Sequence, residues 1–234
     1  MMADAYSRVG PNLAATLSTS GPGATNLITG IACSWFDSVP VLHITGQVNT
    51  YEQIGAQRGT KGVRQIGFQE ADMCSIFKSI TKYTKLILDP NSIKYELEYS
   101  LYLAISGRPG PVLLDIPVDI QRTEIDPNKL NGFKIPSSDI NSISSEQLDA
   151  KLEKLYLDIQ KSERPVFLIG GGVRNAEAIV ELHELGKILE IPMYPTWNAL
   201  DVVTSDYKYY CGRVGTYGGA GRNFGIQNSD LLIS

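Results

Sequence analysis

The chain has 234 residues and a formal net charge of -4, with 43% hydrophobic and 20% charged residues. This composition is typical of a globular protein long enough for one large or two modest domains, and it gives no basic surface for nucleic acid. No apolar run approaches the roughly 20 residues of a membrane-spanning helix, and the first residues lack the layout of a signal peptide, so we expect a cytoplasmic protein without membrane or nucleic-acid partners.

Cysteine and histidine are too sparse and too scattered to predict a metal centre. Cys33, Cys74 and Cys211 are odd in number and far apart, without a Cys-x-x-Cys pair. We therefore expect reduced thiols rather than a disulfide framework or a zinc site. The two histidines, His43 and His183, are far apart and have no cysteine nearby. His43 lies in an apolar strand pattern and is predicted to be a core residue.

The first part of the chain alternates strand patterns with helix patterns. Residues 1–9 have the composition of the end of a helix. Apolar runs predict strands at 13–19, 41–45, 83–88 and 112–116, and the segments between them predict helices at 26–36, 71–80 and 91–105. The polar segment 47–65 is expected to be a long surface loop, either functional or merely solvated. This alternation predicts an α/β fold with a parallel sheet.

The turn at 19–26, called the opening turn below, has the residues of a ligand-binding loop. Gly21 and Gly23 lack the Cβ atoms that would keep a ligand at a distance, and Pro22 fixes φ between them. Thr25 or Asn26 can form hydrogen bonds at the start of the next helix. The same residues also suit a purely structural turn, so turn chemistry alone leaves both interpretations open.

A second domain is expected after a polar, proline-containing stretch between Pro117 and Ser145. We place the first domain at 1–122, the linker at 123–145 and the second domain at 146–234. The second domain is predicted to contain helices at 147–162 and 175–189, strands at 165–169, 191–194 and 231–233, and a loop or short helix at 196–203. A strand, a glycine turn, a helix and a further strand in this order predict a Rossmann-like layer.

The glycine turn of this domain, Gly170-Gly171-Gly172, lies between a predicted strand and a predicted helix, where backbone N–H groups favour a diphosphate. It lacks the spacing of the dinucleotide-binding Gly-x-Gly-x-x-Gly motif, and no acidic residue follows at the distance that a ribose site needs. Nucleotide binding and a plain turn are therefore both open from these residues.

Four stretches of the sequence together resemble a known family. They are Thr19 to Asn26, Asp37 to Val48, Gly67 to Glu70 and Ser106 to Val112. In this order and spacing they are similar to the thiamine-diphosphate (ThDP) enzymes of the acetolactate synthase, or acetohydroxyacid synthase, type. The resemblance implies two parallel-sheet α/β domains, a pyrimidine-binding domain followed by a Rossmann-like central domain, both incomplete at the chain ends.

The resemblance also assigns residues to the ThDP side of the site. It implies that Pro22, Asn26 and Gln69 lie near the aminopyrimidine or the substrate, and that Phe68 supplies an apolar or stacking surface. Glu70 does not match the catalytic glutamate of the family, and we expect a structural role for it.

On the flavin side, the resemblance implies that Arg108 of the first domain and the glycines Gly170, Gly171 and Gly172 of the central domain face FAD or another nucleotide. Arg108 also suits a second role, in which it satisfies carbonyl groups at the end of the helix 91–105. Residues 197–201 depart from the Lys-Gly-Ala/Phe-Pro loop of the family, so FAD, a CoA or ADP group, or no group at all are alternatives. The glycines of 215–222 suit either an adenine or ribose site or simple turns.

The remaining residues of the family's active site fall outside this sequence. The catalytic glutamate would precede Met1, because Ala3 to Arg8 matches, with two replacements, the Ala-Asp-Gly-Tyr-Ala-Arg motif that follows it. The Gly-Asp-Gly motif that binds Mg²⁺ would follow Ser234. We therefore expect no catalytic and no metal-binding residue in this chain, and no turnover by the chain alone.

As part of a longer enzyme, the chain is expected to serve a ThDP-dependent carboligase or decarboxylase of 2-keto acids. The favoured reaction joins two pyruvates into 2-acetolactate and CO₂, and another ThDP decarboxylase or lyase is the alternative within the family. A non-catalytic α/β module that binds a nucleotide or a partner subunit is the alternative outside it. Because the thiamine site of the family lies between subunits, the resemblance also implies a homo-oligomer, either a dimer or a tetramer.

Overall fold

A computed structural model describes residues 1–10, 12–54, 62–136 and 144–234. The chain divides into two compact units, Met1–Asp139 and Ile140–Ser234, which are described separately. Part of the predicted linker 123–145 and part of the predicted loop 47–65 lie outside the described residues. Among the described residues, no helix combines the length and the apolar character that crossing a membrane would need.

The first unit contains a four-stranded sheet in which every pair of neighbouring strands is parallel, in the order β1-β2-β4-β3. Its strands are β1 (Ala14–Ser18), β2 (Val41–Gln47), β3 (Tyr83–Leu86) and β4 (Val112–Pro117). In the register, Ala14 lies beside Val41, and Leu42 lies beside Val112. The parallel sheet and its four strands confirm the α/β prediction, because apolar runs of this length bounded by glycine and proline favour buried parallel strands.

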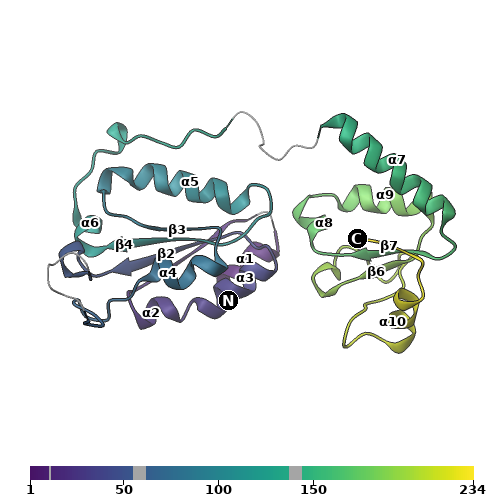
Figure 1. Cartoon of the computed structure of the whole chain (residues 1–234), viewed down its shortest axis with the longest axis horizontal. Helices are drawn as coiled ribbons and strands as arrows, with labels where there is room; N and C mark the ends of the chain where they lie inside the picture. Colours follow the sequence, from purple (N-terminus) through teal and green to yellow (C-terminus); the bar gives the residue numbers. More distant parts are fainter. Residues whose placement is uncertain (11, 55–61, 137–143) are drawn as a thin grey trace. The chain divides into compact units, whose positions relative to one another are not determined.

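Helices cover both faces of this sheet (Figure 1). They are α1 (Met2–Arg8), α2 (Pro22–Thr25), α3 (Ile28–Phe36), α4 (Met73–Phe77), α5 (Ile93–Ile105) and α6 (Val118–Arg122), with 3₁₀ turns η1 (Thr50–Glu52), η2 (Lys78–Ile80), η3 (Pro90–Ser92) and η4 (Pro127–Lys129). On one face, Ile31 of α3 and Phe77 of α4 pack with Leu113. On the other face, Ala104 of α5 packs with Leu42 and Leu114.

Three sequence predictions need correction in this unit. The helix predicted at 26–36 is preceded by the separate short helix α2, because Pro22 is well placed in a first helical turn. The predicted loop 47–65 contains η1, which a capping box formed by Asn49 and Glu52 stabilises. The polar stretch after Pro117 begins with helix α6. This helix was not predicted because it is short and of mixed composition, and so shows no clear hydrophobic periodicity.

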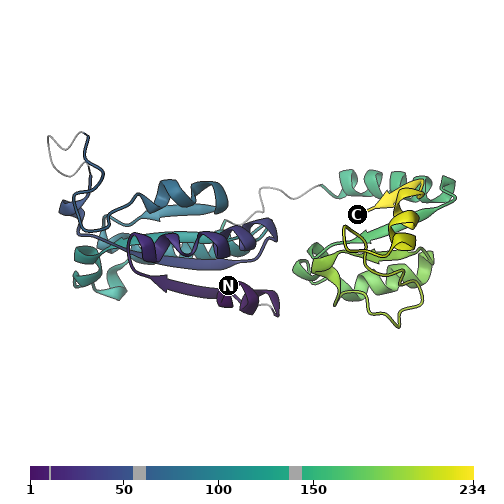
Figure 2. The ribbon, with the colours of Figure 1, turned by 90° about the horizontal axis from the view of Figure 1, so that it is seen from below.

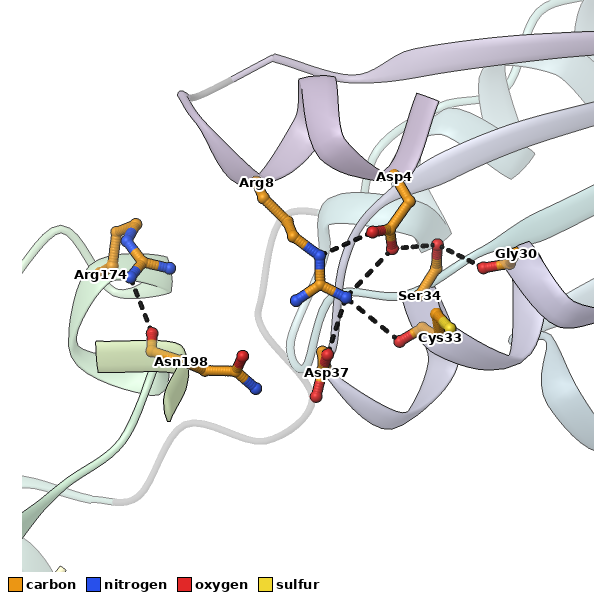
Figure 3. A network of polar contacts seen from close by, with 8 residues as sticks. All are labelled: Asp4, Arg8, Gly30, Cys33, Ser34, Asp37, Arg174 and Asn198. Atoms are coloured by element: carbon orange, nitrogen blue, oxygen red, sulfur yellow. Dashed lines mark hydrogen bonds and ion pairs between the residues drawn. The ribbon is translucent and has the colours of Figure 1, made fainter. Parts of the chain in front are cut away.

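The motif Ala3 to Arg8 fastens α1 to α3 through a polar network (Figure 3). Asp4 is buried, and its carboxylate accepts hydrogen bonds from Arg8 Nε at 2.7 Å and from Ser34 Oγ at 2.8 Å. The Arg8 guanidinium also pairs with Asp37 at 2.7 Å. A buried carboxylate is tolerated because both a charge and a hydroxyl compensate its desolvation.

The second unit contains a three-stranded parallel sheet in the order β6-β5-β7, with helices on both sides of it (Figure 2). Its elements are α7 (Ser145–Lys161), β5 (Pro165–Ile169), α8 (Gly172–Asn175), α9 (Ile179–Leu189), β6 (Met193–Pro195), η5 (Trp197–Ala199), α10 (Ala220–Gln227) and β7 (Leu231–Ile233). The core includes Phe167, Met193 and Val202. The Ser144 side chain accepts a hydrogen bond from Gln147 N at 3.3 Å and caps α7.

Two predictions differ from the structure here. The helix predicted at 175–189 is divided, because α8 ends at Asn175 and Glu177 has a φ of 55°, before α9 begins at Ile179. The glycine-bearing segment 215–230, predicted as turns or a nucleotide approach, contains α10. Glycine disfavours helices in isolation, so only a tertiary contact such as that between Gly225 and Tyr194 accounts for this helix.

Candidate functional site

A pocket of about 480 Å³, called the first pocket, lies at the carboxyl ends of the parallel strands of the first unit. Ligands of open α/β sheets bind at this edge because the strands end there and loops of different origin meet. The opening turn forms part of the wall. The lining residues are Leu17, Ser18, Thr19, Ser20, Ile44, Thr45, Gly46, Gln47, Ile116, Val118 and Gln121.

The opening turn lies directly against the segment 67–71. Gly21 follows the pocket residue Ser20 and has a φ of 56°. A Cβ atom added at Gly21 would lie 2.8 Å from Gln69 Cβ and closer still to the Gln69 carbonyl oxygen. Gln69 itself has a φ of 58°, which is uncommon for a residue other than glycine. The structure thus brings together two segments that are more than forty residues apart in the sequence.

The segment 67–71 has further attachments on both sides of Gln69. Gly67 packs on Val48, because a Cβ atom added at Gly67 would lie 2.8 Å from Val48 Cγ2. The Ala71 carbonyl accepts a hydrogen bond from Gln47 Nε2 at 2.9 Å. The Glu70 carboxylate accepts a hydrogen bond from Ile66 N at 2.8 Å and another from Ile54 N. Glu70 therefore has the structural role that we expected for it.

A buried carboxylate lies directly behind the first pocket. Asp115 is 2% exposed, and its two oxygens accept hydrogen bonds from Thr45 Oγ1 at 2.6 Å and from Gln47 Nε2 at 2.9 Å. Burial raises the pKa of Asp115 to about 6, although these two hydrogen bonds favour the ionised form. Sequence analysis missed this group, and the signal was an aspartate inside the apolar run Val112 to Ile116.

The side chains predicted for the ThDP side lie on the surface around the contact between Gly21 and Gln69. Pro22 and Asn26 are exposed on and after α2, and Phe68 is 80% exposed. Gln69 is also exposed and meets the opening turn through its backbone. An exposed phenylalanine and an exposed amide offer a flat apolar surface and hydrogen-bonding groups, as a planar heterocycle requires. His43, by contrast, is a buried core residue whose Nδ1 contacts Thr16 Oγ1 at 2.7 Å, as the sequence indicated.

The second unit has its own pocket, of about 460 Å³, at the corresponding edge of its sheet. The residues lining this second pocket are Leu168, Thr196, Trp197, Asn198, Val214, Gly215, Thr216 and Tyr217. The Trp197 and Tyr217 rings stack with centroids 5.6 Å apart, and the Arg213 guanidinium lies 5.6 Å from the centre of the Trp197 ring. Stacked aromatic rings beside a cation form a surface suited to a planar or anionic group.

The glycine turn lies beside this second pocket. A Cβ atom added at Gly170 or Gly172 would meet no atom within 4 Å, whereas one added at Gly171 would lie 3.2 Å from Asn198 Cβ. Arg174 of α8 donates a hydrogen bond to the Asn198 carbonyl at 2.7 Å (Figure 3). It donates another to the Asp201 carboxylate at 2.7 Å. The segment 197–201, which departs from the family loop, is therefore joined to the helix that follows the glycines.

Arg108 follows α5 and belongs to the first unit, whereas Gly170, Gly171 and Gly172 belong to the second unit. Its Nε donates a hydrogen bond to Ser38 Oγ at 2.7 Å. The carbonyl of Ser106, at the end of α5, instead accepts a hydrogen bond from Lys82 Nζ at 2.7 Å. At this carbonyl, the cation that satisfies the end of the helix is therefore Lys82 and not Arg108.

Comparison with known proteins gives two matching family models. Residues 1–76 match the model described as "Thiamine pyrophosphate enzyme, N-terminal TPP binding domain". Residues 152–234 match the model described as "Thiamine pyrophosphate enzyme, central domain". The first match includes the opening turn and the segment 67–71, and the second includes the glycine turn and the lining of the second pocket.

Similar proteins with curated names are large subunits or forms of acetolactate synthase. The chain is 38% identical to the acetolactate synthase large subunit of Corynebacterium glutamicum, over 99% of this chain and 35% of that protein. It is 35% identical to the acetolactate synthase isozyme 2 large subunit of Escherichia coli, over 100% of this chain and 40% of that protein. It is 34% identical to the chloroplastic acetolactate synthase of Arabidopsis thaliana, over 99% of this chain and 33% of that protein.

The chain thus spans between a third and two fifths of the length of these relatives. The N-terminal model matches residues of the first unit and the central model matches residues of the second, so the order of the two family models is that of the two units. The chain belongs to the thiamine pyrophosphate enzymes and comprises residues of their N-terminal and central domains.

Proposed function

We propose that this chain is part of a ThDP-dependent carboligase or decarboxylase of 2-keto acids, acting as an acetolactate synthase on pyruvate. The contact between Gly21 and Gln69 is the observation that carries the proposal. It joins the two segments that the family resemblance assigns to the aminopyrimidine side, beside a pocket at the carboxyl edge of the sheet. The similarity to acetolactate synthases along the whole chain favours this reaction over other ThDP reactions.

The residues present suit one wall of a ThDP site. When bound, ThDP supplies a nucleophilic carbon that adds to a keto group and stabilises the carbanion left after CO₂ departs. Within this chain, Pro22, Asn26, Phe68 and Gln69 would orient the aminopyrimidine and exclude water from one side of it. The diphosphate and Mg²⁺ are proposed to bind through residues that complete the site, so the 234-residue chain is expected to show no turnover by itself.

A flavin or another nucleotide is proposed for the second unit. The open space beside Gly170 and Gly172 leaves room for a diphosphate to approach the backbone. The second pocket offers Trp197 and Tyr217 to a planar ring. FAD should remain with the full-length gene product after desalting and give flavin absorbance, and Trp197→Ala should reduce that retention. A colourless parent protein after the same treatment would overturn the flavin proposal.

Two further properties follow from the proposed function. The full-length protein is expected to be a cytoplasmic homo-oligomer, either a dimer or a tetramer. Light scattering that shows a monomer over the whole accessible concentration range would contradict the oligomer.

The reaction itself is tested with the full-length gene product. Pyruvate consumption and formation of 2-acetolactate are measured with ThDP and Mg²⁺, with and without FAD. Turnover that depends on ThDP is the expected result. If the protein binds ThDP but leaves pyruvate unchanged, the family stands and the substrate proposal fails.

A further inference from the structure

The side-chain amide of Gln47 is the central group of a buried network in the wall of the first pocket. Gln47 is 4% exposed, at the end of β2. Its Nε2 donates to Asp115 Oδ2 and to the Ala71 carbonyl, both at 2.9 Å, and its Oε1 accepts from Val48 N at 3.0 Å. Both amide hydrogens and the amide oxygen are therefore used, which fixes the orientation of the amide group.

Asp115 anchors this amide to the sheet. Thr45 and Asp115 are direct neighbours in the pairing of β2 with β4, and Thr45 Oγ1 donates to Asp115 Oδ1 at 2.6 Å. Asp115 is thus held by a hydrogen bond within the sheet while its other oxygen accepts from Gln47. A satisfied polar network of this kind, inside a low-dielectric core, has one preferred arrangement.

The same network reaches the exposed residues at the site. Ala71, bound by Gln47, comes two residues after Gln69, and Val48, bound by the same amide, packs on Gly67. Both ends of the segment 67–71 therefore touch Gln47 or the residue next to it. The middle of the segment meets Gly21 of the opening turn. A five-residue segment held at these three places has little freedom left.

We propose that Gln47 and Asp115 are positioning residues, which hold the segment 67–71 against the opening turn and so fix Phe68 and Gln69 next to that turn. The consequence for ThDP rests on the proposed function, whereas the link between the buried pair and the segment does not. Neither residue needs to touch a ligand for this role.

Amide hydrogen exchange of the ligand-free 234-residue chain tests the link. Gln47→Met keeps the size and removes both donors, so the exchange of peptides covering 67–71 should become about fivefold faster, since a lost hydrogen bond is worth about 1 kcal/mol. Two of the reporting amides are Gly67 N, which donates to the Glu52 carbonyl at 2.8 Å, and Glu70 N, which donates to the Gly67 carbonyl at 3.2 Å.

Two further variants separate positioning from a general loss of stability. Thr45→Val removes the other hydrogen bond to Asp115 but leaves the Gln47 link to Ala71, so exchange in 67–71 should stay within about twofold of the parent. Asp115→Asn keeps an acceptor for Gln47 and should also stay within about twofold. Equal acceleration in Thr45→Val and Gln47→Met, or no acceleration in Gln47→Met, would overturn the proposal.

If Gln47→Met does not fold, Gln47→Asn takes its place, because its shorter amide cannot span Asp115 and Ala71 together and should accelerate exchange in the same way. In the full-length protein, Gln47→Met should raise the Kd of ThDP by about tenfold, whereas Gly107→Ala, which lies outside the lining of the first pocket, should leave it within about twofold. If exchange in 67–71 becomes faster in Gln47→Met as expected but the full-length protein binds no ThDP, the proposed function is wrong and the positioning role stands. If the full-length protein binds ThDP but exchange in 67–71 is unchanged in Gln47→Met, the positioning role is wrong and the proposed function stands.

Discussion

Replacing Gly21 by alanine tests the close contact between the opening turn and the segment 67–71. Gly21 has a φ of 56° and a ψ of -125°, outside the left-handed helical region, and a side chain in such a sparsely populated conformation costs about 1–3 kcal/mol. The added Cβ would also lie 2.8 Å from Gln69 Cβ, and overpacking of this kind costs about 1–3 kcal/mol more. The free energy of unfolding of the first unit should therefore fall by about 2–6 kcal/mol.

Gly107→Ala is a control matched in φ for this experiment. Gly107 also has a φ of 56°, but a Cβ atom added there would meet nothing within 4 Å, so only the backbone cost of about 1–2 kcal/mol applies. Urea unfolding is followed by tryptophan fluorescence in a Trp197→Phe background, in which Trp35 of the first unit is the single tryptophan. Equal losses in the two alanine variants would refute the contact between Gly21 and Gln69.

Two other predictions concern the buried polar groups of the first unit. Because the folded state raises the pKa of Asp115 from 3.8 to about 6, its contribution to the free energy of unfolding should fall by about 2 kcal/mol as the pH rises from 4 to 6, and the full loss of about 3 kcal/mol is reached only well above pH 6. Asp115→Asn should remove this pH dependence, and identical slopes for parent and variant would contradict it. Arg8→Ala leaves the buried Asp4 without its cation and should cost about 2 kcal/mol. Arg8→Lys should recover part of that loss, and a cost below about 0.5 kcal/mol for Arg8→Ala in Trp35 fluorescence would argue against the network.

The sequence predicted those features that depend on local pattern. Strands β1, β2, β4 and β5 were expected within two residues of their ends, because each is a short apolar run closed by glycine, proline or polar residues. The opening turn was predicted for a similar reason, since two glycines that flank a proline favour a turn over a regular helix or strand.

Features that depend on distant partners could not be predicted in this way. Asp115 becomes part of the site only through Gln47, which is 68 residues away in the sequence. Helix α10 contains two glycines and forms where Gly225 allows a close approach to Tyr194. In both cases tertiary packing overrides local preference.

The central claim, that the opening turn and the segment 67–71 form one wall of a ThDP site, is tested most directly by calorimetric titration of ThDP into the full-length gene product with Mg²⁺. The parent should bind, Gly21→Ala should raise the Kd by at least about tenfold, and Gly107→Ala should stay within about twofold of the parent. No binding by the folded parent, or equal binding by Gly21→Ala and the parent, would contradict the claim.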